Sequence, residues 1–164
     1  MSDRTFDTLD IFTVVTALGC GLVAGVFYAF SSFVMKGLGD VPAPQGIAAM
    51  QAINVAAPQP AFMVGLMGTA LASVVLGGWS LLHLDEPGAG YRLAGSVLYL
   101  VAAIAITGAY HVPRNDKLMT FDPQSAEGAR YWATYLSNWT AWNHVRMAGS
   151  LAAAASLMLS LRIG

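Results

Sequence analysis

Charged side chains are scarce in this sequence, and their scarcity argues against a water-soluble domain. Only 10% of the 164 residues are Asp, Glu, Lys or Arg, while 56% are hydrophobic. Soluble domains are typically about one quarter charged. The formal net charge of −1 gives no basic footprint of the kind that nucleic-acid binding needs. Cysteine is almost absent as well, and the single Cys20 excludes an intramolecular disulfide and a cysteine-rich metal or cluster site.

Long hydrophobic runs separate the few charges. Three runs without Asp, Glu, Lys or Arg are long enough for a membrane-spanning helix, which needs about 20 residues. They are residues 11–35, 61–82 and 93–113. A fourth run, 147–161, is shorter, but neither Pro nor Gly interrupts residues 129–148 before it. Because no Asp or Glu lies inside these runs, the acidic relay of a proton-coupled pump or small multidrug exporter is missing.

The pattern predicts an all-α protein, a four-transmembrane-helix bundle with a long fourth helix. The whole chain, 1–164, is expected to form one integral membrane domain. The helices are expected at about 9–36, 60–83, 91–112 and 129–162. Prolines on both sides of residues 45–57 predict a short interfacial helix between helices 1 and 2. The leader, residues 1–10, lacks the basic n-region of a signal peptide, so we expect helix 1 to be retained.

This topology gathers the polar residues at one end of the bundle. With four spans, the connections after helix 1 and after helix 3 lie on the same side of the membrane, next to the first half of helix 4. Pro113 is expected to end helix 3, because proline cannot continue the helical hydrogen bonding. His111 and Asn115 flank this proline, and Tyr28 and Ser32 approach the same end on helix 1.

Helix 4 carries a stripe of aromatic and polar residues. Spacings of three, four, four and three place its members on one helical face. They are Trp132, Tyr135, Trp139, Asn143 and Arg146. His144 lies about 100° away around the helix. Because Arg and His are costly near hydrocarbon, we expect Asn143, His144 and Arg146 to face the bundle interior rather than lipid. The expected neighbours across the bundle are Tyr28, Ser32 and Asn115.

Plainer roles compete with this interpretation. Arg146 could extend to lipid headgroups, and His144 could be an ordinary interfacial residue. The Ser32 hydroxyl could simply bond to its own helix. Gly21 and Gly25 form a small-xxx-small pattern, which allows close packing of a neighbouring helix and predicts a homo-oligomer through this face.

Four segments together resemble the anthrone oxygenase-like family of small four-helix membrane proteins, and the resemblance covers nearly the whole chain. The most specific is the Trp-Asn-His-Val-Arg run at 142–146, preceded by Trp132, Tyr135, Trp139 and Thr140. The others are Pro113-Arg-Asn-Asp-Lys-Leu118, Gly25 to Phe30-Ser31, and Met50-Gln51 with Asn54. One position departs from the pattern, because the family usually has Asn where this chain has His111.

The resemblance implies a multi-pass oxidoreductase of the bacterial inner membrane. Its expected activity is that of a cofactor-independent monooxygenase, which oxidises a hydrophobic phenolic or quinone-like molecule with dioxygen and holds no metal. His144 is then the expected base, with Arg146 stabilising the substrate anion and Asn143 orienting its carbonyl. The expected substrate-binding residues are Trp139, Trp142, Tyr135, Asn115, His111, Tyr28, Ser32, Gln51 and Asn54. The expected partners are this small molecule, dioxygen and membrane lipid, without nucleic acid.

Two other classes of function remain open at this point. One is a non-enzymatic membrane module that binds a ligand or lipid, or that serves assembly. The other is a haem- or metal-dependent redox protein, in which His111 and His144 would be the axial ligands.

Overall fold

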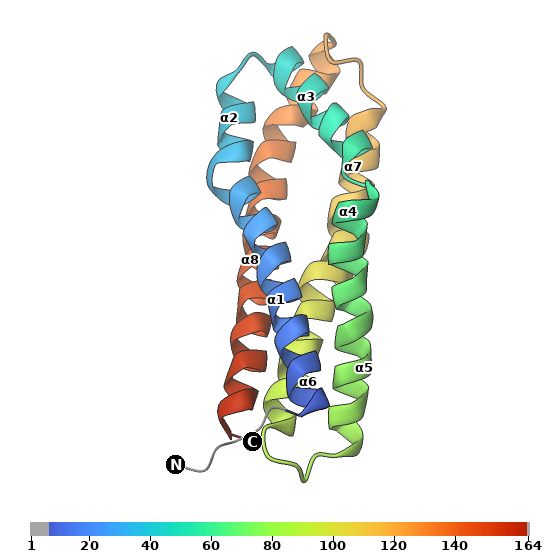
Figure 1. The fold of residues 1–164 in the computed structure, drawn as a ribbon. Coiled ribbons are helices and arrows are strands. Elements are labelled where there is room, and N and C mark those ends of the chain that lie inside the picture. The colour runs from blue at the N-terminus through green and yellow to red at the C-terminus, as the bar shows by residue number, and fades with distance from the viewer. Residues whose placement is uncertain (1–6, 164) are drawn as a thin grey trace.

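Four long helical segments form the molecule in the computed structural model, which describes residues 7–163. The first span consists of α1 (Thr8–Ala29), η1 (Phe30–Val34) and α2 (Met35–Asp40). The second consists of α4 (Pro60–Met63), η2 (Val64–Gly68) and α5 (Thr69–Leu82). The third consists of α6 (Ala89–Tyr99), η3 (Leu100–Ala105), η4 (Thr107–His111) and α7 (Val112–Met119). The fourth is α8 (Ala126–Ile163), and α3 (Ala43–Ala56) lies between the first and second spans (Figure 1).

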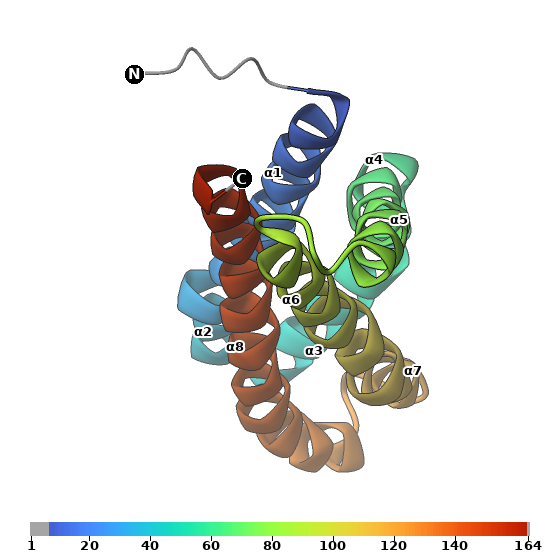
Figure 2. The same cartoon turned by 90° about the horizontal axis from the view of Figure 1, so that it is seen from below.

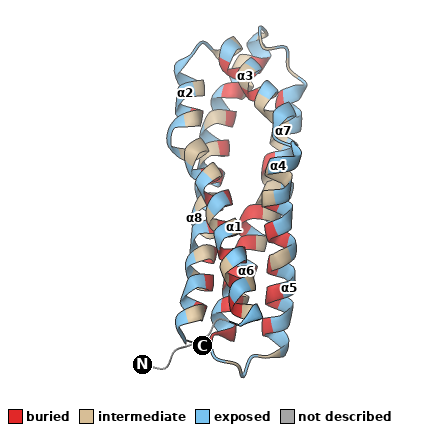
Figure 3. Cartoon of the chain, in the orientation of Figure 1, coloured by how far each residue is buried: buried red, intermediate tan, exposed pale blue. Residues whose placement is uncertain are grey.

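The predicted fold is confirmed. All four segments are long and apolar enough to cross a membrane, and α8 has 38 residues. The short helix between the first two spans is α3, which has Pro42 as its N-cap and Pro44 in its first turn. Large side chains such as Leu22, Leu71 and Leu151 are exposed on the outer faces of the spans (Figure 3). An apolar outer surface of this kind suits lipid. The start of the leader, residues 1–6, lies outside the described residues.

The two ends of the bundle differ. The start of α1, the end of α8 and the turn between α5 and α6 lie together at one end (Figure 1). We call this the turn end. At the other end, α2, α3 and α7 surround the first half of α8 (Figure 1), and we call it the polar end. Seen from below, the third span crosses the bundle at a tilt, with α6 near the centre and α7 at the periphery (Figure 2).

The third span does not end at Pro113, contrary to the prediction. The helix continues through this proline to Met119, so the connection to α8 is shorter than expected. The turn before it, η4, is π-helical, with hydrogen bonds that span five residues. Such a turn already departs from the α-helical hydrogen-bond ladder, which lets the helix accommodate a residue without an N–H. Arg114 Nη1 also donates to the carbonyl oxygen of Tyr110 at 3.0 Å.

Glycines bring the helices together in the half of the bundle near the turn end. A Cβ atom at Gly77 would lie 2.9 Å from Ser96 Cβ, and one at Gly95 would lie 2.8 Å from Leu157 Cγ. By contrast, a Cβ atom at Gly21 or Gly25 would meet nothing within 4 Å. The small-xxx-small pattern on α1 therefore does not pack inside the chain, and its use in a homo-oligomer stays a prediction.

Candidate active site

A cavity of about 520 Å³ lies near the polar end and is lined by residues of all four spans and α3. This volume is within the range of sites for drug-sized ligands. On the side of the turn end, Phe27 and Leu66 line the cavity and also belong to one hydrophobic core cluster. On the other side, Met50 and Trp139 line the cavity and belong to a second cluster, which is rich in aromatic residues. The cavity is thus a gap between two packed cores.

The first and second spans form an apolar wall. Val26, Phe27 and Phe30 line the cavity from the first span. Phe62, Met63, Leu66 and Met67 line it from the second. These side chains offer no hydrogen bond, but their rings and thioethers pack well against a flat or irregular apolar ligand.

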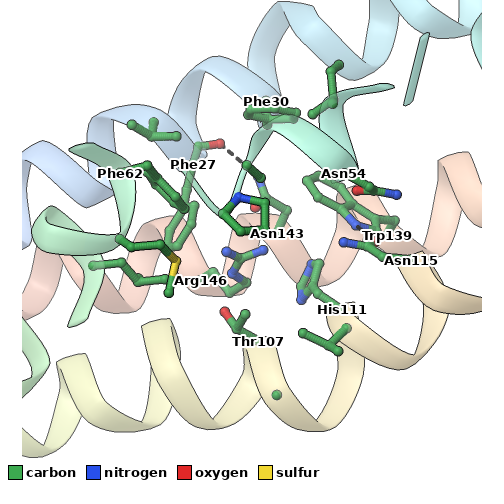
Figure 4. A pocket seen from close by; sticks show the side chains of 18 of the residues that line it. Phe27, Phe30, Asn54, Phe62, Thr107, His111, Asn115, Trp139, Asn143 and Arg146 are labelled. Carbon is green, nitrogen blue, oxygen red and sulfur yellow. Dashed lines mark hydrogen bonds between the residues drawn. The ribbon is translucent and has the colours of Figure 1, made fainter. Parts of the chain in front are cut away.

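The third and fourth spans form a polar wall opposite. Thr107, His111 and Asn115 come from the third span, and Trp139, Asn143 and Arg146 come from α8. Each set recurs every three or four residues, so each forms a row on one helical face. Asn54 adds an amide from α3. Figure 4 shows the His111 and Arg146 side chains extending into the space between these helices.

The π-helical turns η1, η2 and η4 all contribute residues to the cavity: Phe30 in η1, Leu66 in η2, and Thr107 and His111 in η4. A π turn disturbs the backbone hydrogen bonding and is frequent at functional sites. Neighbouring side chains bond to carbonyl oxygens near these turns. Asn143 Nδ2 donates to Phe27 O at 2.7 Å and to Ser31 Oγ at 2.8 Å, and Tyr99 OH donates to Leu66 O at 3.0 Å.

Several buried polar atoms of the lining residues have no hydrogen-bond partner within the described chain. They are Asn54 Nδ2, His111 Nε2, Asn143 Oδ1 and Arg146 Nε. An unsatisfied buried polar group costs about 1–3 kcal/mol, and native structures contain few of them. Their concentration around one cavity indicates a place for a polar ligand group.

Arg146 is the most unusual of these residues. It is 6% exposed, and within residues 7–163 no carboxylate forms an ion pair with it. Its guanidinium stacks on the Phe27 ring, with Cζ 3.8 Å from the ring centroid. A buried charge without a counter-ion is costly, and the cation–π contact offsets only part of that cost. An anionic or strongly polar ligand oxygen would complete the site.

Asn115 is held in one orientation. Its Oδ1 accepts hydrogen bonds from Tyr135 OH at 2.7 Å and from Trp139 Nε1 at 3.0 Å. Because both partners donate, the oxygen must face them, and the Nδ2 amide remains as a donor for a ligand acceptor. Tyr135 is 2% exposed and supports Asn115 from behind instead of lining the cavity.

Other predicted site residues lie outside the cavity. The expectation that His144 faces inward is wrong, because His144 is exposed and lines a separate, shallow hollow between the third and fourth spans. Successive residues of a helix point about 100° apart. Since Asn143 and Arg146 face the cavity, His144 between them cannot. Trp142 is 41% exposed, and its ring packs at a tilt of 32° against Tyr110 with ring centroids 4.7 Å apart.

Some of the site residues predicted on helix 1 and α3 also lie outside the cavity. Tyr28 and Ser32 are exposed, and Ser32 Oγ donates to Tyr28 O at 2.7 Å within its own helix. The neighbouring Ser31 contacts Asn143 instead. Gln51 does not line the cavity, because its Nε2 donates to Leu118 O at 3.0 Å and to Phe121 O at 2.9 Å. It fastens α3 to the end of α7.

Thr107 and the apolar wall were not predicted from the sequence. Thr107, His111 and Asn115 recur at intervals of four, a signal that was available. The second span gave no comparable sign, because Phe62, Met63 and Leu66 resemble ordinary lipid-facing residues in sequence.

The two histidines face different spaces. His111 is 1% exposed in the cavity, whereas His144 lines the outer hollow. An axial pair for one haem would need both to face the same space. In the part of the chain that the structure describes, no three His, Cys, Asp or Glu side chains form a group suited to a metal ion.

Comparison with known proteins gives one match. A family model described as "Anthrone oxygenase" matches residues 59–156, more than half of the 164 residues. The matched region contains the second and third spans and the cavity-lining residues of α8. No curated protein and no solved structure matches the chain.

Proposed function

Because this chain belongs to the anthrone oxygenase family, we propose that it is an oxygenase of the bacterial inner membrane. It oxidises a hydrophobic phenolic or quinone-like substrate with dioxygen, without a cofactor. One observation above all supports this proposal: His111, Asn143 and Arg146, which line one largely apolar cavity, each have a buried polar atom without a partner in the described chain.

The family description suggests the type of reaction. An anthrone has a CH₂ group between two aromatic rings, opposite a ring carbonyl. Loss of a proton from this CH₂ gives a delocalised anion that can react with dioxygen. In the full reaction one oxygen atom becomes the new carbonyl oxygen, and the other leaves as water with the two hydrogen atoms of the CH₂. The protein must supply a base, a stabiliser for the anion and a dry pocket.

We assign the role of general base to His111 instead of His144. Its Nδ1 lies 3.5 Å from the carbonyl oxygen of Ile106. A carbonyl only accepts hydrogen bonds, so this contact favours the tautomer with the proton on Nδ1. The Nε2 atom, which has no partner in the described chain, then carries the lone pair that can take a substrate proton.

Arg146 and Asn115 are suited to hold the anion. The guanidinium has no competing carboxylate in the described chain, so its full charge is available to a phenolate or enolate oxygen. Such preorganised donors are worth most where water is excluded. The Asn115 amide, fixed by Tyr135 and Trp139, is a donor for a second substrate oxygen. Asn143 Oδ1 can accept a hydrogen bond from a phenol O–H, since its Nδ2 already donates to the first span.

The apolar wall completes the proposed site. Phe27 and Phe62 offer ring surfaces for a flat substrate. The same wall keeps water away, which strengthens the electrostatic interactions of Arg146 and protects a reactive anion.

The test compares the two histidines in the purified protein, with oxygen consumption and product formation followed on an anthrone. We expect His111→Ala to lower kcat by about 10²–10⁴-fold, the usual contribution of a general base. His144→Ala, the matched control, should stay within about twofold because the side chain is outside the cavity. Full activity of His111→Ala, or its loss in His144→Ala alone, would contradict the assignment.

The same unpartnered atoms also suit a module that binds a phenolic ligand without reacting. This second function predicts that the protein retains such a ligand and that the ligand is recovered unchanged after incubation in air. Turnover by the wild-type protein would exclude it.

A further inference from the structure

The cavity has an opening on one side. The lining residues from the first span and from α8 are buried or half-buried. The exposed lining residues come from the second span, the third span and the end of α3. The large apolar ones are Met67 (48% exposed), Val112 (45%), Met119 (42%) and Val55 (68%). We call this opening, with the exposed Gly108, the mouth.

Part of the mouth lies at the depth of the hydrocarbon layer. The second span, Pro60–Leu82, has 23 residues, about the length that crosses a bilayer. Met67 is seven residues from its start, roughly 10 Å at about 1.5 Å per residue. Gly108, which also lines the cavity, is nineteen residues from the start of the third span at Ala89, roughly 28 Å by the same rise and so within a hydrocarbon core of about 30 Å. This part of the mouth therefore faces lipid chains rather than water.

The deeper part of the mouth and the interior differ in polarity, whereas the exposed Asp116 lines the cavity one turn closer to the end of the third span. The unpartnered atoms of His111, Asn143 and Arg146 belong to the inner, polar wall. The lipid-facing part of the mouth is formed by Met67, Gly108 and Val112, which offer no polar side-chain group. A Cβ atom at Gly108 would meet nothing within 4 Å, so no side chain closes the passage there. Met63 and Met67 beside it are flexible side chains that adapt to a variable apolar occupant.

We propose that the substrate is an amphipathic lipid: a phenolic ring that carries an aliphatic tail. The ring occupies the cavity with its oxygen towards Arg146 and His111, and the tail leaves through the mouth, past Met67, Gly108 and Val112, into the bilayer. This inference rests on the proposed function for its phenolic ring, but the position of the tail follows from the shape and polarity of the cavity.

The first experiment locates the tail by photolabelling. The full-length protein in phospholipid nanodiscs binds a 4-alkylphenol with a diazirine near the end of its chain, under argon, so that no turnover occurs. Adducts are mapped by mass spectrometry with and without an excess of 4-dodecylphenol. We expect the adducts that the competitor removes to lie on the second and third spans, around Met67 and Val112. Competitor-sensitive adducts on the first and fourth spans, or none at all, would overturn the proposal.

The second experiment narrows the mouth. Gly108→Trp is compared with Gly68→Trp, whose glycine is exposed on the second span, has nothing within 4 Å of its Cβ position and does not line the cavity. The readout is the ratio of affinities for 4-dodecylphenol and 4-ethylphenol, again under argon. We expect Gly108→Trp to lower this ratio about tenfold or more, since several CH₂ groups lose their place, and Gly68→Trp to leave it unchanged. An unchanged ratio in both variants would overturn the proposal.

The two proposals fail in different ways. Tail adducts at the mouth without any oxidation in air would refute the oxygenase function and keep the lipid ligand. Oxidation of an anthrone by a protein that gives no competitor-sensitive adducts would keep the oxygenase and refute the tailed substrate.

Discussion

The half of the bundle near the turn end and the half around the cavity use the same four spans in opposite ways. Near the turn end, Gly77 and Gly95 let helices approach until an added methyl group would collide with Ser96 or Leu157. Around the cavity, residues of the π-helical turns η1, η2 and η4 and large aromatic side chains line the space between the helices. The half near the turn end therefore supplies rigidity, while the half around the cavity supplies space for a ligand.

Two buried arginines show the same contrast. Arg92 and Arg146 are both 6% exposed. Arg92, near the turn end, donates to Glu86 Oε2 at 2.9 Å and to Pro87 O at 3.3 Å. Arg146, in the cavity wall, has no ion pair within residues 7–163, and its guanidinium lies over the Phe27 ring. A partnered charge holds a turn together, whereas an unpartnered charge is available to a ligand.

Replacing each arginine by Met should separate these roles most clearly. We expect Arg146→Met to lower kcat/KM by about 10²–10³-fold, the effect of losing a preorganised donor, with no loss of stability because an uncompensated charge is removed. Arg92→Met should lower the free energy of unfolding by about 1–3 kcal/mol, because it leaves the partly exposed Glu86 without its partner. Thermal unfolding in detergent and turnover are the measurements. A strongly destabilised Arg146→Met would erase the contrast between the halves.

A larger side chain at Gly95 should disrupt the helix packing near the turn end. Gly95→Leu would force the third and fourth spans apart, since its Cβ position also lies 3.0 Å from Ala153 O. We expect the free energy of unfolding to fall by about 2–3 kcal/mol. Gly90→Leu, in the same helix α6, is the control, because nothing lies within 4 Å of its Cβ position. Equal stability of the two variants in a denaturation series would show that the packing near the turn end is looser than the contacts indicate.

We expect a smaller effect on kcat/KM from a substitution at Tyr135, which lies behind the cavity wall. Tyr135→Phe removes one of the two donors to Asn115 Oδ1 and leaves Trp139 as the other. We expect kcat/KM to fall about fivefold, the equivalent of one hydrogen bond worth about 1 kcal/mol. Tyr131→Phe is the control, because its hydroxyl bonds to Arg114 O instead. An identical effect of both variants would argue against a specific role for the orientation of Asn115.

The sequence predicts the fold well, because charge spacing is a direct measure of what can enter hydrocarbon. Lys36, Arg92 and Arg114 bound runs that became spans, and the prolines around α3 separate it from its neighbours. The prediction that helix 3 ends at Pro113 was wrong, because proline ends a helix by removing a hydrogen bond from an α-helical ladder. A preceding π turn departs from that ladder, and hydrophobic periodicity does not reveal π turns.

The site could be predicted only in part. Asn143, Arg146 and Trp139 line the cavity as the stripe on helix 4 predicted. The choice of His144 conflicted with that same stripe, because a residue about 100° away cannot share its face. Ser31 rather than Ser32 contacts Asn143, a shift of one residue inside η1. The other lining residues could not be predicted, because they depend on where the helices diverge. That divergence results from packing in three dimensions and leaves no local pattern in the sequence.

The π turns also make the register of the first three spans depend on a single residue. A π turn contains one residue more than the α-helical turn it replaces, so deleting one residue of η4 would restore α-helical phase and rotate everything after it by about 100°. Asn115 would then leave the side of Tyr135 and Trp139, while α6 on the other side of the deletion would keep its contacts. Deletion of Ala109, an η4 residue that does not line the cavity, would therefore act as a rotation of α7 and not as a shortening. It would dismantle the polar wall without removing any of the residues that form it.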